Sequence, residues 1–96
     1  TASSQEEAGA IAHALVSRKL AACVSIMPIQ SVYSWQGDIQ TDQEWQLLIK
    51  TTLDCWQALE TAINELHSYE VPELIALPIV QGSSAYLNWL GDMTVS

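Results

Sequence analysis

The fold is decided by the stretch SVYSWQGDIQTDQEWQLLIKTT, residues 31–52. Residues 31–35 have the β-branched and aromatic composition typical of a strand, and Gln36-Gly37-Asp38 supplies a glycine-centred turn. A returning strand is predicted from about Gln43 to Thr52, because apolar side chains alternate along it. One face of this strand contains Trp45, Leu47 and Ile49, and the other contains Gln46, Leu48 and Lys50. The stretch therefore predicts an antiparallel hairpin.

The residues before the hairpin predict a helix followed by a strand. Ser4 and Glu7 form a capping-box pair, and apolar residues then recur at helical spacing. This helix should end near the basic pair at 18–19, where positive charge complements the helix dipole. Residues 23–27 alternate as a strand. We expect Pro28 to interrupt that strand before it resumes in the decisive stretch.

The residues after the hairpin predict a helix, a strand and a short last helix. Asp54 is the expected cap of the second helix, and Pro72 prevents its extension. Its apolar face comprises Cys55, Leu59, Ala62, Ile63 and Leu66. Residues 74–80 form the longest apolar run and read as a strand with apolar side chains on both faces. Residues 82–84 then introduce a helix that contains Tyr86, Trp89, Leu90 and Met93.

Composition excludes several functions. The 96 residues contain three basic and eleven acidic side chains, which gives a formal net charge of −8. Nucleic acids and anionic membranes both require clusters of Lys and Arg, so neither is an expected partner. Hydrophobic residues make up 49% of the chain and charged residues only 15%. Apolar residues on both sheet faces, with few helices to cover them, favour an oligomer.

Residues 1–96 read as a single domain of a cytoplasmic protein. The length fits one modest core, and no internal repeat appears. Cys23 and Cys55 lack metal-type spacing and do not form a disulfide framework, which favours a reducing compartment. No apolar run has the length of a transmembrane helix, and residues 1–7 do not resemble a signal peptide.

Several segments together resemble the CutA family, also called divalent-cation tolerance protein. They keep the family's order and spacing from about Glu6 to Leu90. The segments are KLAACV (19–24), SVYSWQG (31–37), LLIKTT (47–52), HSYEVPE (67–73), LPI (77–79) and YLNWL (86–90). One departure is Ser68, where the family's His-Pro-Tyr motif has proline.

The resemblance implies an α+β, ferredoxin-like sandwich of βαββαβ order with an extra terminal helix. It also implies a tight cytoplasmic homotrimer similar in architecture to the PII signalling proteins. The family's first strand would precede Thr1, so we expect it to lie outside these 96 residues.

His67 and Cys23 are the candidate metal ligands, with copper or another divalent cation as the ion; no cofactor is required. Imidazole is a common copper and zinc ligand, and helical geometry places His67 partly exposed at the end of the second helix. Alternatively, protonated His67 complements the helix dipole. In the family, metal binding is linked to this histidine, a neighbouring histidine and a first-strand cysteine; Leu66 replaces the neighbour here. Cys23 is a soft ligand or a buried hydrophobe.

The second candidate site is a ligand-binding cleft formed by Trp35, Lys50, Tyr69 and Glu70. Lys50 is the only Lys or Arg in the second half of the chain, and Glu70 or Glu73 can pair with it. Such a cleft would hold a small ligand with an anionic or aromatic group. The alternative is a structural ion pair at a subunit seam. Other carboxylates, namely Glu6, Glu7, Asp38, Asp42 and Glu44, are explained by capping and solvation at helix starts and turns.

Three hypotheses follow from these residues. The first is a homotrimer associated with divalent-cation, and especially copper, tolerance through metal binding. The second is a PII-like sensor or interaction module that binds a small ligand in an inter-subunit cleft. The third is an enzyme, which is the weakest because no nucleophile has an identifiable base. We expect a binding protein and not an enzyme.

Overall fold

A long antiparallel hairpin is the central element of the computed structural model, which describes residues 1–95. Strand β1 (Cys23–Trp35) pairs with β2 (Asp38–Lys50), in a register from Cys23 opposite Lys50 to Trp35 opposite Asp38. The two turn residues, Gln36 and Gly37, have φ values of 50° and 86°. Two successive positive φ values are typical of the type I′ turn, whose twist matches that of the strands. The predicted hairpin is confirmed.

The expected break at Pro28 is wrong, because β1 runs through it without interruption. Pro28 lies opposite Trp45, whose backbone N–H and C=O both bond to Ala2 on the far side of β2, at 2.9 and 2.8 Å. Pro28 and Trp45 are therefore a non-hydrogen-bonded pair, in which the proline nitrogen faces away from β2. The missing N–H removes no ladder bond, so the strand tolerates the proline.

Strand β2 also differs from its predicted bounds, since it begins at Asp38 and ends at Lys50. The prediction began at Gln43, where the apolar alternation starts. Residues 38–42 are polar except for Ile39 and mostly exposed, and they are extended because they pair with the end of β1. Pairing therefore extends the hairpin beyond the region that hydrophobic pattern identifies.

Helix α1 (Gln5–Ser17) confirms the predicted first helix. Ser4 is its N-cap, and the Ser4 hydroxyl accepts a 3.0 Å hydrogen bond from the Glu7 backbone N–H. Lys19, two residues beyond the helix, has a left-handed φ of 58°, a conformation that turns the chain back toward β1.

Helix α2 (Trp56–Leu66) follows a short 3₁₀ turn, η1 (Leu53–Cys55). Asp54 was the expected cap, but it lies inside the 3₁₀ turn, and neither η1 nor α2 has a side-chain cap. Because of this tight turn, α2 begins two residues after Asp54. The Asp54 side chain therefore does not cap the first backbone N–H groups of α2. The predicted apolar face is confirmed, since Cys55, Leu59, Ala62 and Ile63 are buried.

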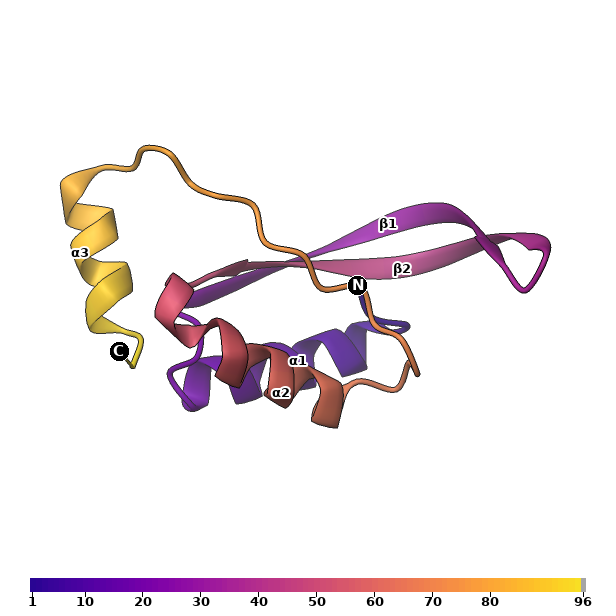
Figure 1. Cartoon of the computed structure of the whole chain (residues 1–96), viewed down its shortest axis with the longest axis horizontal. Helices are drawn as coiled ribbons and strands as arrows, with labels where there is room; N and C mark the ends of the chain where they lie inside the picture. The colour runs from indigo at the N-terminus through magenta and orange to yellow at the C-terminus, as the bar shows by residue number, and fades with distance from the viewer. Residues whose placement is uncertain (96) are drawn as a thin grey trace.

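Both helices lie on one side of the hairpin, next to its open end, and the core lies between them and the strands (Figure 1). The buried cluster comprises Ile11, Leu15, Leu20, Ala21, Leu59, Ala62 and Ile63, and Val24, Leu47, Ile49, Leu66 and Leu74 pack against it. Leu47 and Ile49 come from the strand face that the alternation identified. The turn end of the hairpin projects beyond the helices (Figure 1).

The residues after Pro72 form what we call the C-terminal arm, residues 72–95. Residues 74–80 were predicted to be a strand, and this is wrong for the described chain: they run extended but unpaired. A strand exists only where a neighbouring strand supplies a hydrogen-bond ladder, and the described sheet is the two-stranded hairpin. The arm continues into helix α3 (Ser84–Asp92), which confirms the predicted last helix, and the Ser83 hydroxyl caps it by accepting a hydrogen bond from Tyr86 N–H.

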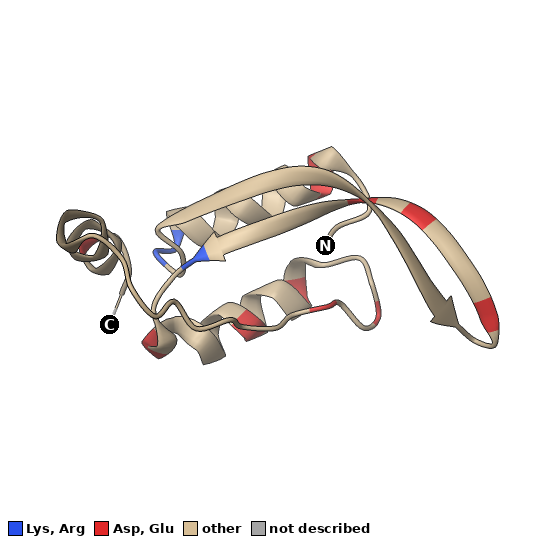
Figure 2. Cartoon of the chain, turned by 90° about the horizontal axis from the view of Figure 1, so that it is seen from above, with Lys and Arg blue, Asp and Glu red and all other residues tan. Residues whose placement is uncertain are grey.

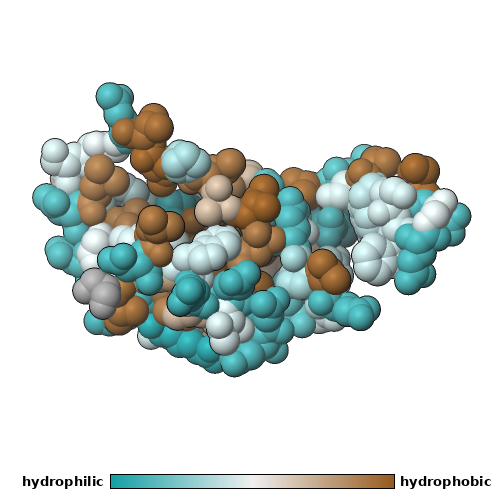
Figure 3. Space-filling model, viewed as in Figure 1, coloured by the Kyte–Doolittle hydropathy of each residue, from teal (hydrophilic) through white to brown (hydrophobic). Residues whose placement is uncertain are grey.

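The arm exposes much of its apolar surface. Leu77 is 82% exposed and Val80 is 90% exposed, and Figure 3 shows hydrophobic side chains over this part of the molecule. Its end is attached, because Val95 N donates to Lys19 O at 2.9 Å and Cys55 Sγ donates to Val95 O at 3.0 Å. Within residues 1–95, none of the helices is both long and apolar enough to cross a membrane.

Candidate functional site

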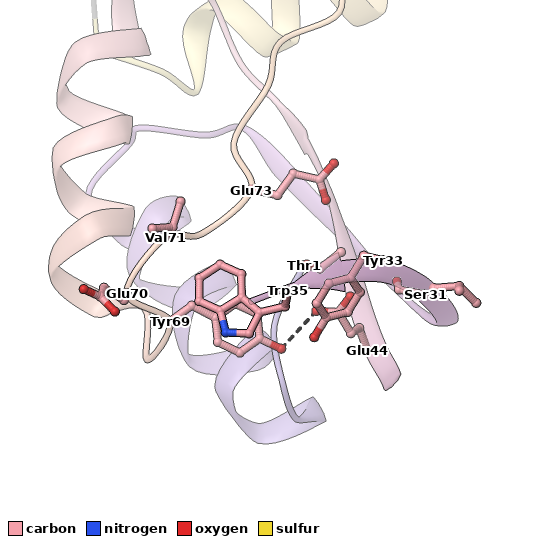
Figure 4. Close-up of a pocket in the computed structure, with 10 residues that line it drawn as sticks. Thr1, Ser31, Tyr33, Trp35, Glu44, Tyr69, Glu70, Val71 and Glu73 are labelled. Atoms are coloured by element: carbon pink, nitrogen blue, oxygen red, sulfur yellow. Dashed lines mark hydrogen bonds between the residues drawn. The ribbon is translucent and has the colours of Figure 1, made fainter. Parts of the chain in front are cut away.

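A pocket of about 620 Å³ lies where the turn half of the hairpin meets the segment after α2 (Figure 4). The end of β1 supplies one wall, Glu44 comes from β2, and residues 69–73 supply the opposite wall. The structure therefore brings together Trp35, Tyr69 and Glu70, three of the four residues predicted for the cleft. The lining residues are Thr1, Ser31, Val32, Tyr33, Trp35, Glu44, Tyr69, Glu70, Val71 and Glu73.

Glu44 is the buried acid of this pocket, with only 6% of its surface exposed. The Tyr69 hydroxyl donates a 2.9 Å hydrogen bond to Glu44 Oε2, drawn as the dashed line in Figure 4. Burial raises the pKa of Glu44, but hydrogen bonds from Ser31, Tyr69 and Thr1 outweigh it and hold the pKa below its usual value. Burial and the bond to Glu44 raise the pKa of Tyr69 well above its ordinary range. At neutral pH this pair is a carboxylate and a neutral phenol.

A second tyrosine and carboxylate pair lies beside the first. The Tyr33 hydroxyl donates to Asp42 Oδ2, and this bond raises the pKa of Tyr33. Tyr33 and Asp42 are diagonal neighbours across the strands, since Tyr33 lies opposite Gln40. The register also places Asp42 on the same face as Glu44, so acidic and aromatic side chains share this face of the hairpin.

Glu44 was explained in advance as a carboxylate of a helix start or turn, and that interpretation is wrong. The residue lies in the middle of β2, opposite Ile29, and is almost completely buried. The predicted strand from about Gln43 already contained Glu44, so the error was to interpret this carboxylate together with those of the turn. A glutamate inside a paired strand is unusual enough to signal a buried partner.

His67 ends helix α2 and is half-buried, as its helical position predicted. Its Nδ1 accepts a 2.9 Å hydrogen bond from the Tyr69 backbone N–H, and its Nε2 lies 2.6 Å from Thr1 O. An amide N–H can only donate, so Nδ1 is unprotonated and Nε2 donates its hydrogen to the carbonyl. Both ring nitrogens therefore have hydrogen-bond partners. The ring also packs on Tyr69, with centroids 4.6 Å apart.

Glu7 fixes the segment that follows His67. Its Oε1 accepts from Ser3 N and Ser3 Oγ, both at 3.0 Å, and its Oε2 accepts from Ser68 N at 2.8 Å. Burial raises the pKa of Glu7, but the hydrogen bonds from Ser68 and Ser3 lower it to about 2. The capping-box position identified Glu7 as structurally important, but only the folded chain shows that it holds the pocket wall next to Tyr69.

Lys50 and Cys23 lie at the open end of the hairpin, opposite each other in the register. Lys50 is six residues from Glu44, roughly 20 Å along the strand. The Lys50 ammonium donates to Ser25 Oγ at 2.7 Å and Leu48 O at 3.0 Å, and not to Glu70 or Glu73 as suggested from the sequence. The structure therefore does not bring Lys50 to the pocket.

Cys23 and His67 are not neighbours either. The Ala2 bridge to Trp45 places the amino-terminal residues that His67 contacts beside the middle of β2. Trp45 is five residues from the Cys23 partner at the strand end, roughly 17 Å. Within residues 1–95, no three His, Cys, Asp or Glu side chains converge on a position that could hold a metal ion. Within one chain, these residues do not fit a copper site made of both candidate ligands.

Charge is unevenly distributed along the molecule. The three basic residues, Arg18, Lys19 and Lys50, gather where α1 and β2 end (Figure 2). Acidic residues are spread over the hairpin, the helices and the segment that leads into the arm (Figure 2). The pocket lining contains three glutamates and no Lys, Arg or His side chain.

Similarity to known proteins is extensive. A relative from Thermus thermophilus, named divalent-cation tolerance protein CutA, is 48% identical and is matched over 98% of this chain and 92% of its own length. An Arabidopsis thaliana relative, named protein CutA, chloroplastic, is 46% identical over 98% of this chain. The chain spans 52% of that relative's length.

Solved structures of similar proteins superpose closely on this chain. A Thermus thermophilus structure, described as divalent cation tolerance protein (Cut A1), gives a TM-score of 0.95 at 47% identity, covering 98% of this chain and 92% of its own. An Archaeoglobus fulgidus structure, described as periplasmic divalent cation tolerance protein CutA, gives 0.94 at 37% identity over 96% of this chain and 90% of its own. The family model described as CutA1 divalent ion tolerance protein matches residues 1–93. The chain belongs to this CutA1 family.

Proposed function

We propose that this protein acts in divalent-cation tolerance by binding a divalent cation, with copper as the first ion to test. The observation that carries the proposal is membership of the CutA1 divalent ion tolerance family over residues 1–93. A formal net charge of −8 supports it, because an acidic surface raises the local concentration of cations. Surface charge alone selects no particular ion, so selectivity requires individual ligands.

His67 and Cys23 are separate candidate ligands in this proposal, and no step is derived through the pair. Copper coordination by His67 requires one ring nitrogen to give up its present partner, Thr1 O or Tyr69 N–H. Exchange of one such hydrogen bond costs about 1 kcal/mol, which is small against a metal–imidazole bond.

Equilibrium dialysis against Cu²⁺ tests this proposal directly. Wild-type protein is expected to bind copper stoichiometrically, and His67→Ala should lose that binding. His13→Ala is the matched control, because His13 is exposed on α1. Unchanged binding by His67→Ala would remove this residue from the site, and absence of binding by the wild type would contradict the copper proposal.

The proposed assembly is a homotrimer with a completed ferredoxin-like sheet. The unpaired residues 74–80 support this arrangement, because residues 1–95 of one chain leave most of their apolar side chains and backbone groups uncovered. Sedimentation at micromolar concentration should show a species of three times 10.5 kDa. A folded species at the mass of one chain would contradict the trimer.

The proposed location is the cytoplasm. Both cysteines, Cys23 and Cys55, are free thiols, as expected in a reducing compartment. Fractionation of cells that express the protein at its natural level tests this assignment. Recovery outside the cytoplasmic fraction would contradict it.

A second candidate function is a PII-like sensor that binds a small ligand. The pocket at Trp35, Tyr69 and Glu70 favours it, because a concave site with aromatic walls and a few polar groups is typical of ligand binding. The assembled protein should then show ligand-dependent thermal shifts. No catalytic role is proposed, since no nucleophile and base pair was identified in the sequence.

A further inference from the structure

The charged side chains that line the pocket are acidic, whereas the cleft suggested by the sequence included a lysine. With Lys50 at the open end of the hairpin, bonded to Ser25, the cleft loses its only predicted cation. The side chains that line the pocket with a charge are Glu44, Glu70 and Glu73, and each is acidic. These charged side chains would repel a ligand with an anionic group and attract a cation.

The buried acid strengthens this preference. Glu44 is 6% exposed and its lowered pKa keeps it ionised at neutral pH. Tyr69 fixes the orientation of the carboxylate through Oε2, and a carboxylate can accept further hydrogen bonds. Because water screens a buried charge weakly, a cation beside Glu44 gains more there than at an exposed acid.

The aromatic walls determine the kind of cation. Tyr33, Trp35 and Tyr69 come from two separate segments and line one pocket. The faces of Trp and Tyr rings attract ammonium groups, and aromatic rings also cover the carbon atoms attached to such groups. A pocket of about 620 Å³ has room for an organic molecule of several carbons.

We infer that this pocket binds an organic ammonium ion, with the charged group beside Glu44 and the carbon chain against Trp35 and Tyr33. The inference rests on the second candidate function, the small-ligand sensor, and names the chemical class of its ligand. Glu70 and Glu73 at the arm side of the pocket attract the cation on approach. Tyr69 acts as the residue that positions Glu44.

Isothermal titration calorimetry of the assembled protein with n-butylammonium and n-butyrate tests the ligand class. The two probes share the carbon chain and differ in the sign of the charge. We expect n-butylammonium to bind at least about tenfold more tightly than n-butyrate, since cation–π and buried carboxylate contacts together exceed the 1.4 kcal/mol of a tenfold change. Equal or tighter binding of n-butyrate would overturn the inference.

Variants locate the binding. Glu44→Gln should weaken n-butylammonium binding about tenfold, and Glu60→Gln, an exposed acid on α2, should leave it unchanged. Because the loss of a buried carboxylate can disturb folding, Trp35→Ala is the second variant. Trp35 is 47% exposed, so its replacement spares the core and should weaken binding at least about threefold. Binding unchanged in both Glu44→Gln and Trp35→Ala would overturn the inference.

The outcomes separate the ligand class from the sensor function. Preference for n-butyrate rejects the ammonium class while the sensor function stands. Failure of both probes, together with no thermal shift from any metabolite, rejects the sensor function as well. If the protein binds Cu²⁺ but neither n-butylammonium nor n-butyrate, the inference is rejected in favour of metal binding alone.

Discussion

The helical body and the C-terminal arm use apolar residues in opposite ways. In the body, α1 and α2 cover the open half of the hairpin, and Leu15 and Leu59 are almost completely buried. In the arm, Leu77 and its apolar neighbours contact little of the chain, although that segment is at least as hydrophobic. The body is therefore stabilised by contacts within one chain, whereas the arm needs contacts from elsewhere.

This difference shows that hydrophobic sequence fixes which residues must be covered but not what covers them. Burial of a leucine side chain contributes about 1.5–3 kcal/mol only when another surface meets it. Leu77, 82% exposed, gains little of this within residues 1–95. The body and the arm should therefore respond differently to the same substitution.

The largest expected effect comes from the core of the body. Leu59→Ala should lower the free energy of unfolding by about 2–5 kcal/mol, because it leaves a cavity between α2 and the hairpin. Leu77→Ala is the matched substitution in the arm, where the leucine is 82% exposed in the chain. Urea denaturation of both variants at several protein concentrations measures the two costs.

Dilution distinguishes the two substitutions. The cost of Leu59→Ala should be the same at every concentration. The cost of Leu77→Ala should appear only where chains assemble, and at dilutions that separate the chains it should fall below about 0.5 kcal/mol. A large cost of Leu77→Ala in dissociated chains would break the distinction between body and arm.

The body was largely predictable because its signals are local. Helical spacing identified α1, the Ser4 cap marks the start of α1, and Gln36-Gly37 marks the hairpin turn. Each of these signals acts over a few residues, so neighbouring sequence is sufficient to detect it. The same holds for the buried face of α2.

The errors arose where a distant segment decides the outcome. Pro28 is tolerated because Ala2 occupies the other edge of β2 at Trp45, which neighbouring residues do not reveal. Residues 74–80 have strand composition but find no ladder partner within the described chain. The pocket was predicted only in part. Residue types suggested Trp35 and Tyr69 as lining residues. The strand register, which residue types do not reveal, places Glu44 in the pocket and Lys50 away from it.

A smaller effect is expected at the junction where the body passes into the arm. Glu7 joins the start of α1 to Ser68, and Glu7→Gln should cost about 1–2 kcal/mol at pH 7, since it weakens charge-assisted hydrogen bonds. The pKa of Glu7 is lowered from 4.5 to about 2, so its ionised form stabilises the folded state. This stabilisation is complete above about pH 4.5 and is lost as the pH falls toward 2.

Urea midpoints measured from pH 7 to pH 2 check this dependence. The difference between wild type and Glu7→Gln should shrink across that interval. Glu6→Gln is the control, because the Glu6 carboxylate is exposed and shows no comparable contacts. A difference that stays constant down to pH 2 would mean that the charge of Glu7 contributes nothing to the junction.

The smallest expected effect compares a glycine of a body helix with one of the arm helix. Gly9 in α1 and Gly91 near the end of α3 both have open space where a Cβ would be added. Alanine favours a helix over glycine by about 0.5–1 kcal/mol, chiefly by reducing the freedom of the unfolded chain. Gly9→Ala should add that amount to global stability, because α1 unfolds together with the core.

Gly91→Ala should slow amide hydrogen exchange in α3 with a smaller change in the global midpoint, because the helix is joined to the body mainly through Leu90 and the tail after it. Equal global gains from the two substitutions would show that α3 and the body unfold as one unit, so that the arm already belongs to the cooperative core.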